Sequence, residues 1–243
     1  MNSTTDKIIA AAVALGITAL LIAGVSMATK PSVVASARAA AVPAPIETAS
    51  SSAVASGQLE TVVFAGGCFW GVQGVFQHVK GVQRAVSGYA GGNASDANYE
   101  LVSSGTTGHA EAVQVVYDPA QVSYGKLMQV FFSVVHDPTQ LNYQGPDHGT
   151  QYRSAVFTTT PAQLSATKSY IAQLQKAKTF AAPIATEVSS AKPFYPAESY
   201  HQDYLTLNPN AAYIRYYDAP KLAALKSTYP ALYNPSPALV AGR

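Results

Sequence analysis

Cysteine is almost absent from this chain, because Cys68 is the single one among 243 residues. One cysteine cannot form an intramolecular disulfide, although exported proteins usually meet an oxidising compartment. Cys68 is therefore either an inert thiol in the core or a reactive one. The count alone favours the inert thiol by about two to one, since free cysteine behaves as a small hydrophobic residue.

Strong charge of one sign is also lacking. Fifteen Lys and Arg stand against thirteen Asp and Glu, and no basic run forms the patch that nucleic acid or an anionic surface requires. The five histidines match no metal-ligand spacing, and one cysteine adds little to them. We therefore expect no nucleic-acid partner, no bound metal and no cofactor.

One long hydrophobic run is present, from Ile8 to Ala28, and it follows Lys7. It predicts either an export signal, with small residues such as Ser26 and Ala28 suited to cleavage, or an uncleaved membrane anchor. No cysteine lies directly after the run, which excludes a lipid-modified cysteine at a cleavage site. The expected location is exported, periplasmic or anchored to the membrane by this segment.

Composition divides the chain into four parts. Residues 1–30 form the signal peptide or anchor, and the Ala-, Ser- and Pro-rich residues 31–58 suit a flexible linker. Residues 59–235 form one folded domain, and 236–243 are a tail. The length suits a single domain with its own core, and a monomer is the default expectation.

Hydrophobic periodicity predicts an α+β domain. The expected strands are Thr61–Ala65, Val82–Tyr89, His109–Tyr117, Ser154–Thr159 and Ile184–Ser190, and the expected helices begin near Phe69, Ser123 and Thr160. Their order is that of a ferredoxin-like split βαβ unit, a mixed sheet with helices on one face. The long loop His136–Tyr152 is expected to be functional. The Tyr- and Pro-rich chain after Pro193 is expected to wrap the domain with little regular structure.

Cys68 follows Gly66 and Gly67 at a strand-to-helix turn, where free backbone N–H groups and the helix dipole favour a thiolate. Phe69 and Trp70 come next. Adjacent helix residues cannot both face one core, so at least one is expected to line an apolar pocket beside the thiol, suited to a methyl group. These neighbours favour a reactive cysteine.

Glu111 is the second candidate. Strand alternation puts it on the same face as Val113, Val115 and Tyr117. A carboxylate on an apolar face is costly unless it is neutral or paired. If Glu111 is buried, its pKa should rise and make it a proton donor near neutral pH. The alternative is a different register that leaves Glu111 in solvent.

Six segments match a known family in order. They are Gly67-Cys68-Phe69-Trp70-Gly71, Gly88-Tyr89-Ala90-Gly91-Gly92, Gly108-His109-Ala110-Glu111-Ala112-Val113, His136-Asp137-Pro138-Thr139-Gln140-Leu141-Asn142, Gly149-Thr150-Gln151-Tyr152-Arg153-Ser154 and Phe194-Tyr195-Pro196-Ala197-Glu198. Over roughly residues 60 to 230, the sequence resembles the A-type peptide methionine sulfoxide reductases. The resemblance implies that residues 59–235 are a catalytic domain.

The resemblance also implies roles for individual residues. Cys68 would be the nucleophile and Glu111 the acid that protonates the sulfoxide oxygen. The other implied residues are Phe69 and Trp70 around the substrate methyl group, Tyr99 and Tyr152 as hydrogen-bond donors to the oxygen, and Asp147 beside the pocket. Gln73 stands where relatives often have Glu, and we hold that Gln73 is not the acid because Glu111 remains.

Many relatives carry a second, resolving cysteine near the C-terminus. Here the chain after Pro209 reads Asn210-Ala211-Ala212-Tyr213, without a cysteine. The sulfenic acid formed on Cys68 would therefore need an external thiol reductant, thioredoxin-like or glutathione-like.

The expected function is reduction of the S-epimer of methionine sulfoxide, protein-bound and free, as repair of oxidised exported proteins. Two alternatives use the same residues differently. A thiol peroxidase-like redox enzyme would use the lone activated Cys68 on peroxide. An inactive module would bind methionine-containing segments through Phe69 and Trp70, and such a module would need neither Cys68 nor Glu111.

Overall fold

The computed structural model describes residues 41–46, 58–190 and 192–240, all within one compact unit. The signal or anchor expected at residues 1–30 and most of the linker expected at 31–58 lie outside the described residues. Within the described ranges, no helix is both long enough and apolar enough to cross a membrane.

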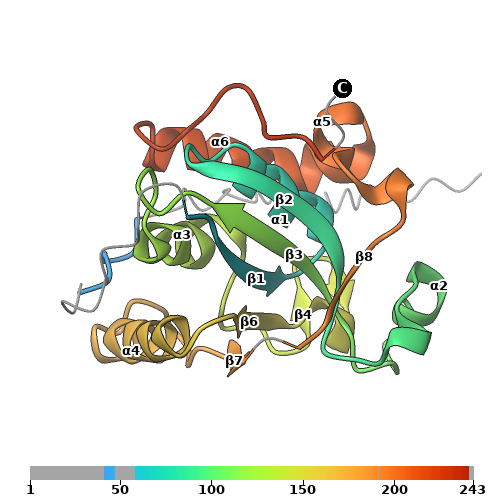
Figure 1. The fold of residues 1–243 in the computed structure, drawn as a ribbon, viewed down its shortest axis with the longest axis horizontal. Helices are drawn as coiled ribbons and strands as arrows, with labels where there is room; N and C mark the ends of the chain where they lie inside the picture. Colours follow the sequence, from blue (N-terminus) through green and yellow to red (C-terminus); the bar gives the residue numbers. More distant parts are fainter. Residues whose placement is uncertain (1–40, 47–57, 191, 241–243) are drawn as a thin grey trace, which may run out of the picture. The chain divides into compact units, whose positions relative to one another are not determined.

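A six-stranded sheet organises the domain (Figure 1). Its order is β7 (Glu187–Ser190), β6 (Ser154–Thr158), β1 (Glu60–Gly66), β3 (Ala110–Tyr117), β2 (Val82–Ala90) and β8 (Phe194–Pro196). β3 pairs antiparallel with both β1 and β2, so β1 and β2 run in the same direction with β3 between them. β6 is antiparallel to β1, and β7 adds a parallel edge strand. This is the split βαβ arrangement, and the predicted ferredoxin-like α+β fold is confirmed.

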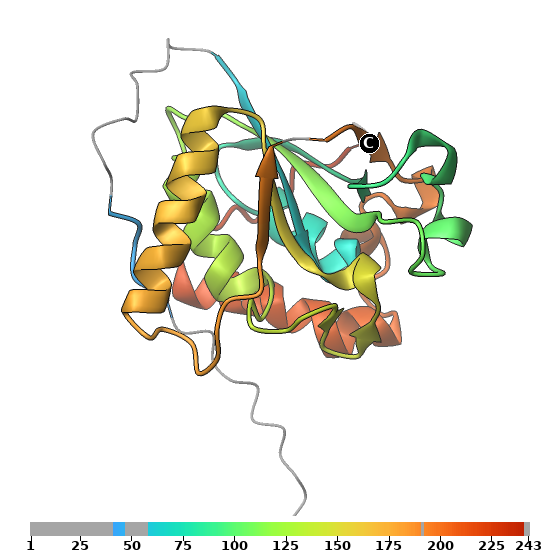
Figure 2. The ribbon, with the colours of Figure 1, turned by 90° about the horizontal axis from the view of Figure 1, so that it is seen from below.

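The helices pack on one face of this sheet (Figures 1 and 2). The longer ones are α1 (Phe69–Gln77), α3 (Tyr124–Val130), α4 (Pro161–Lys176) and α6 (Ala219–Thr228), and α3 continues into the π-turn η2 (Phe131–Val135). Phe64 of β1 stacks between Phe76 and Phe131, with ring centroids 4.8 and 4.7 Å away. On the opposite face, smaller side chains such as Ala65, Ala110 and Ala112 form a second cluster.

Short elements complete the domain. They are α2 (Tyr99–Val102), α5 (Tyr204–Leu207), the 3₁₀ turns η1 (Ala94–Asp96), η3 (Thr150–Tyr152) and η4 (Ser199–His201), the π-turn η5 (Ile214–Asp218), and a hairpin of β4 (Tyr143–Gln144) and β5 (Asp147–His148). The hairpin and η3 lie in the loop predicted from His136 to Tyr152.

Two helix starts follow their sequence signals. Ser123 accepts a hydrogen bond from the Lys126 N–H at the start of α3. Thr160 does the same for the Gln163 N–H at the start of α4, where Pro161 occupies the first turn. Both predicted helices are confirmed.

The C-terminal segment wraps the domain as expected, but it carries more regular structure than its composition indicated. β8 extends the sheet beside β2, and α6 spans ten residues. Among the residues of α6, Leu225 alone is fully buried. A helix with so narrow a buried face needs little apolar periodicity in its sequence, so the pattern did not predict it. The tail expected from residue 236 onward also contacts the domain, because the Ala238 N–H donates a hydrogen bond to the Gln77 carbonyl at 3.0 Å.

Residues 41–46, within the expected linker, lie against α3 and α4, and we call them the strap. Val42 is buried, and its carbonyl accepts a 2.8 Å bond from Gln129 Nε2. The Gln173 amide holds two backbone groups at once, donating to the Ala44 carbonyl at 2.7 Å and accepting from the Ile46 N–H at 2.9 Å. At least this part of the linker is docked on the domain.

Candidate active site

Cys68 lies between the end of β1 and the first residue of α1. The two glycines before it allow this turn. A Cβ on Gly66 would meet the His136 and Phe131 side chains at 3.2 Å, and Gly67 has φ +90° with Gln144 only 2.7 Å from an added Cβ. Cys68 itself is half-buried. The turn therefore holds the thiol at a helix N-terminus, as the sequence predicted.

Glu111 reaches this turn from β3. Its side chain is 3% exposed, and Oε2 accepts a hydrogen bond from the Phe69 N–H at 3.0 Å. Val113 lies on the same face of β3 in the main core, so the register that would have left Glu111 in solvent is excluded. Burial raises the pKa of Glu111 to about 8, with the Phe69 hydrogen bond opposing the rise and the Asp147 charge adding to it. The carboxyl is therefore mostly protonated at neutral pH.

The acidity of Cys68 differs from the sequence expectation. Burial raises the pKa of the thiol well above its ordinary value, and the nearby Glu111 and Asp218 carboxylates raise it further. The Trp70 N–H and the Lys221 ammonium act in the opposite direction and are outweighed. The direction of this shift runs against the expectation that the helix N-terminus makes a thiolate accessible near neutral pH. Desolvation of the charged form dominates there.

Phe69 and Trp70 form an aromatic wall beside Cys68. Phe69 is buried, with its ring 4.9 Å from that of His201. Trp70 is partly exposed and stacks on Tyr204 at 3.9 Å between centroids. Its Nε1 donates to His201 Nδ1 at 3.2 Å. These contacts fix the position of the indole two residues after Cys68.

Tyrosine hydroxyls from separate elements complete the site. Burial raises the pKa of Tyr99 on α2 and of Tyr152 on η3, and for both the Glu111 charge is the next cause. Both hydroxyls therefore stay protonated and can donate hydrogen bonds. Tyr99 is 38% exposed, and its backbone N–H donates to Glu198 Oε1 at 2.9 Å. Tyr152 is partly buried.

Asp147 on β5 lies near the same groups, because its charge raises the pKa values of Glu111 and Tyr152. It accepts a hydrogen bond from the hydroxyl of Tyr213. The residues predicted for the site thus converge around one thiol from the β1–α1 turn, α2, β3, β5 and η3. They are Cys68, Phe69, Trp70, Tyr99, Glu111, Asp147 and Tyr152.

Sequence reasoning gave no role in the site to four residues of this neighbourhood. They are His201, Tyr213, Asp218 and Lys221. Tyr213 directly follows Asn210-Ala211-Ala212, a stretch that entered the sequence argument only because it lacks a resolving cysteine. Burial raises the pKa of Tyr213, with the Cys68 charge as the second cause, so this hydroxyl also stays protonated near the sulfur. No local spacing linked it to Cys68.

Gln73 belongs to the packing of α1. It is fully buried, and its Nε2 donates to the Ala85 carbonyl at 3.0 Å and to Gln202 Oε1 at 2.9 Å. Its Oε1 accepts the Asp203 N–H at 2.8 Å. Both ends of the amide are engaged in joining α1 to β2 and the C-terminal segment.

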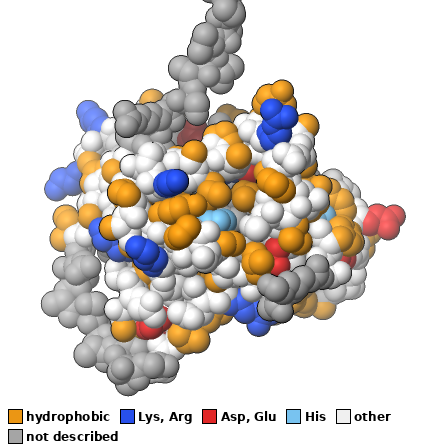
Figure 3. Space-filling model, turned by 90° about the horizontal axis from the view of Figure 1, so that it is seen from above, with side chains coloured by type: hydrophobic (Ala, Val, Ile, Leu, Met, Phe, Trp, Pro, Cys, Tyr) orange, Lys and Arg blue, Asp and Glu red, His pale blue; other side chains and the backbone are white. Residues whose placement is uncertain are grey.

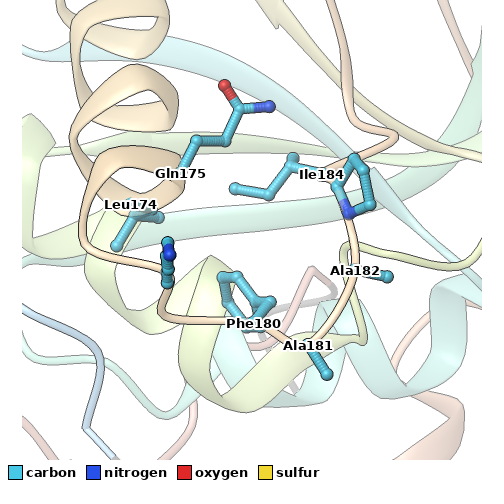
Figure 4. A pocket seen from close by; sticks show the side chains of 8 residues that line it. Leu174, Gln175, Phe180, Ala181, Ala182 and Ile184 are labelled. Atoms are coloured by element: carbon cyan, nitrogen blue, oxygen red, sulfur yellow. The ribbon is translucent and has the colours of Figure 1, made fainter.

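No three His, Cys, Asp or Glu side chains in the described ranges are placed to hold a metal ion. A pocket of about 380 Å³ lies between the end of α4 and the following loop, and Leu174, Phe180 and Ile184 are among the residues that line it (Figure 4). On the face in Figure 3, Lys and Arg side chains are scattered and form no continuous basic patch.

Comparison with known proteins identifies the family. A family model described as peptide methionine sulfoxide reductase matches residues 60–232, which contain every site residue named above. The chain belongs to the peptide methionine sulfoxide reductase family.

Curated relatives place this reductase among the A-type members. It is 62% identical over 181 residues to peptide methionine sulfoxide reductase MsrA 2 of Mesorhizobium japonicum, a match that covers 74% of this chain and 93% of the relative. It is 53% identical over 170 residues to MsrA 2 of a Synechocystis strain, covering 70% of this chain and 79% of the relative.

Solved structures agree with the fold of this reductase. Mxr1 of Saccharomyces cerevisiae in its reduced form aligns with a TM-score of 0.58 at 35% identity, covering 63% of this chain and 88% of Mxr1. Methionine sulfoxide reductase A of Corynebacterium diphtheriae aligns with a TM-score of 0.55 at 36% identity, covering 70% of this chain and 85% of that protein.

Proposed function

We propose that this reductase converts the S-epimer of methionine sulfoxide to methionine, in proteins and as the free amino acid, with Cys68 as nucleophile and Glu111 as acid. One observation carries the proposal. The protonated Glu111 carboxyl is hydrogen-bonded to the backbone of Phe69, the residue directly after Cys68. A thiol and a neutral acid on the same small site are what the reduction of a sulfoxide requires.

The chemistry balances without an added cofactor. The Cys68 sulfur attacks the sulfoxide sulfur, the S–O bond of the substrate breaks, and the oxygen is transferred to Cys68. The substrate sulfur gains two electrons and leaves as a thioether, while Cys68 loses two and becomes a sulfenic acid. Glu111 donates its proton to the departing oxygen, where it becomes the proton of the sulfenic acid, and the Cys68 thiol proton passes to Glu111 and restores the neutral carboxyl.

The other site residues orient the substrate in this proposal. The rigid face of Trp70 holds the substrate methyl group, with Phe69 behind it. The hydroxyls of Tyr99 and Tyr152 donate to the sulfoxide oxygen, where negative charge grows as the S–O bond breaks. Asp147 fixes the hydroxyl of Tyr213 at the edge of the pocket.

Regeneration needs a partner, because Cys68 is the single cysteine of the 243 residues. An external thiol attacks the sulfenic acid, releases water and forms a mixed disulfide. A second thiol then attacks that disulfide and restores Cys68. A thioredoxin-like dithiol or two glutathione-like monothiols satisfy this balance.

The apolar run from Ile8 to Ala28 supports an exported enzyme that repairs oxidised exported proteins, either periplasmic or anchored to the membrane. We propose that it works as a monomer, since every group invoked above comes from one chain.

The first test is turnover of the purified chain on S- and R-epimers of a methionine sulfoxide peptide, with dithiothreitol as reductant. We expect reduction of the S-epimer alone, abolished by Cys68→Ser and slowed about 100-fold or more by Glu111→Gln. Glu100→Gln, which changes an exposed carboxylate beside Tyr99, should behave as wild type.

Two experimental results would contradict the proposal and favour one of the alternatives. Faster turnover of hydrogen peroxide than of either sulfoxide would favour the thiol peroxidase alternative. Tight binding of methionine peptides by a folded protein that reduces neither epimer would favour the binding module.

A further inference from the structure

Asp218 lies buried against the first turn of α1. Its side chain is 0% exposed, and a Cβ on Gly71 would come within 2.1 Å of its Oδ1. Glycine at position 71 therefore leaves the space that the carboxylate fills. Gly71 is three residues after Cys68, and helix residues at this spacing share a face. The carboxylate thus lies beside the turn that begins at the thiol.

Lys221 on α6 is the partner of Asp218. Its Nζ lies 3.1 Å from Asp218 Oδ1, and its side chain is 20% exposed. The other carboxylate oxygen, Oδ2, is buried and has no hydrogen-bond partner among the described residues. A buried ion pair that leaves one oxygen unsatisfied is a poor device for stability, because desolvation offsets its attraction. Its position beside Cys68 points to a different role.

We propose that Asp218 and Lys221 are positioning residues of the reductase site, a buried charged pair beneath the first turn of α1 that sets the electrostatic environment of Cys68 and Glu111. Nothing in the family match or in the sequence pattern assigned them this role. The inference deepens the reductase chemistry proposed above and rests on it.

The charges around Cys68 and Glu111 support this assignment. The titratable groups that act on one or both of them are Asp147 on β5, Asp218 at the end of η5 and Lys221 on α6, while Tyr99, Tyr152 and Tyr213 face the same space. The Asp218 charge raises the pKa of Cys68, after burial and Glu111, and that of Glu111, after burial and Asp147. Lys221 lowers the pKa of Cys68 and so limits the effect of Asp218.

The proton balance of the reaction explains why the negative charge of Asp218 matters for Cys68 and Glu111. The product state holds a sulfenic acid and a protonated Glu111, and therefore two protons. A resting state with a Cys68 thiol and a protonated Glu111 holds the same two, so no proton has to enter the site during the reductive step. Asp218 favours this resting state because its negative charge disfavours ionisation of both groups.

The experiment uses the full chain with Asp218→Asn, which keeps the shape of the side chain and removes its charge. The rate of Cys68 alkylation by iodoacetamide is measured against pH, together with the pH dependence of kcat and KM for an S-sulfoxide peptide. We expect the alkylation midpoint to fall by about one pH unit, since an unopposed ammonium remains near the sulfur. The alkaline limb of kcat should move to lower pH as well, with KM little changed.

Three further variants isolate the charge. Lys221→Arg keeps the cation and should retain the wild-type alkylation midpoint. The double variant Asp218→Asn with Lys221→Met removes both charges and should bring the midpoint back toward wild type. Lys226→Met removes an exposed cation from the same helix and should leave both profiles unchanged.

The outcomes separate this inference from a structural role and from the reductase proposal. If folded Asp218→Asn shows only a lower thermal midpoint of unfolding, with its alkylation profile unmoved, the pair is structural and the inference is overturned. Alkylation reports thiol ionisation without turnover. An alkylation shift in a chain that reduces no sulfoxide would therefore support the electrostatic role while refuting the proposed reductase chemistry.

Discussion

The Phe69 N–H donates to Glu111 Oε2 at 3.0 Å, and this bond joins the first peptide of α1 to a buried carboxyl of β3. The helix begins directly after Cys68, so this hydrogen bond ties the acid to the residue next to the thiol. A backbone donor opposes the rise in the Glu111 pKa, but burial outweighs it and the carboxyl stays mostly neutral. The reductive half of the proposed cycle depends on that balance.

The pH dependence of the reductive step should follow Glu111. The active form is the protonated one, and its pKa is about 8. Single-turnover reduction of an S-sulfoxide peptide should therefore be highest below pH 8 and fall about tenfold for each further pH unit. In Glu111→Gln, the residual rate should lack this alkaline decline. A decline retained in that variant would assign the titration to another group.

Trp70 should contribute through both its face and its Nε1. Trp70→Phe keeps an aromatic wall but loses the bond to His201, and we expect a fall in kcat/KM of about 3- to 10-fold. Trp70→Ala also removes the wall and should cost about 100-fold. Steady-state kinetics on one peptide tests both, and equal losses in the two variants would contradict a role for the aromatic face.

Tyr213 should matter through its hydroxyl. Tyr213→Phe breaks the bond to Asp147 and leaves that carboxylate without its donor, so kcat should fall about tenfold. Tyr216→Phe, at a side chain 72% exposed, is the matched control and should retain wild-type kinetics. If both variants behave as wild type, Tyr213 lies outside the working site.

Gly67 should be intolerant of a side chain for two reasons. Its φ is +90°, and Gln144 lies 2.7 Å from an added Cβ. We expect Gly67→Ala to lower the free energy of unfolding by about 2–4 kcal/mol, measured with urea. Gly145→Ala separates the two causes, because Gly145 has φ +61° with no atom within 4 Å of its Cβ position. It should cost only about 1 kcal/mol.

The strap should stabilise the domain through Gln173. Gln173→Ala removes the bonds to the Ala44 carbonyl and the Ile46 N–H, and should lower the free energy of unfolding by about 1–2 kcal/mol. Gln175→Ala, at an exposed position on the same helix, should change it by less than about 0.5 kcal/mol. The same measurement on both variants decides whether the strap is bound in solution.

Prediction from sequence succeeded where the signal was local and periodic. The alternation of β3 indicated that Glu111 faces the core, and the Gly66-Gly67 pair marked the turn before Cys68. The caps of α3 and α4 marked their first residues. α6 was not predicted because Leu225 is its one fully buried side chain, and a single buried position gives no apolar periodicity in the sequence.

The sequence by itself determined the family, the α+β order of strands and helices, the turn that holds Cys68 and the core-facing position of Glu111. The surroundings that raise the pKa of the Cys68 thiol come only from the tertiary structure, because its burial and the Glu111 and Asp218 carboxylates are contributed by segments distant in the chain. The tertiary structure also decided the roles open to Asp218 and Lys221, which follow Cys68 by some 150 residues and reach it only because α6 and η5 pack on α1. Electrostatic energies depend on separation in space and on exclusion of water, and neither is encoded in local spacing.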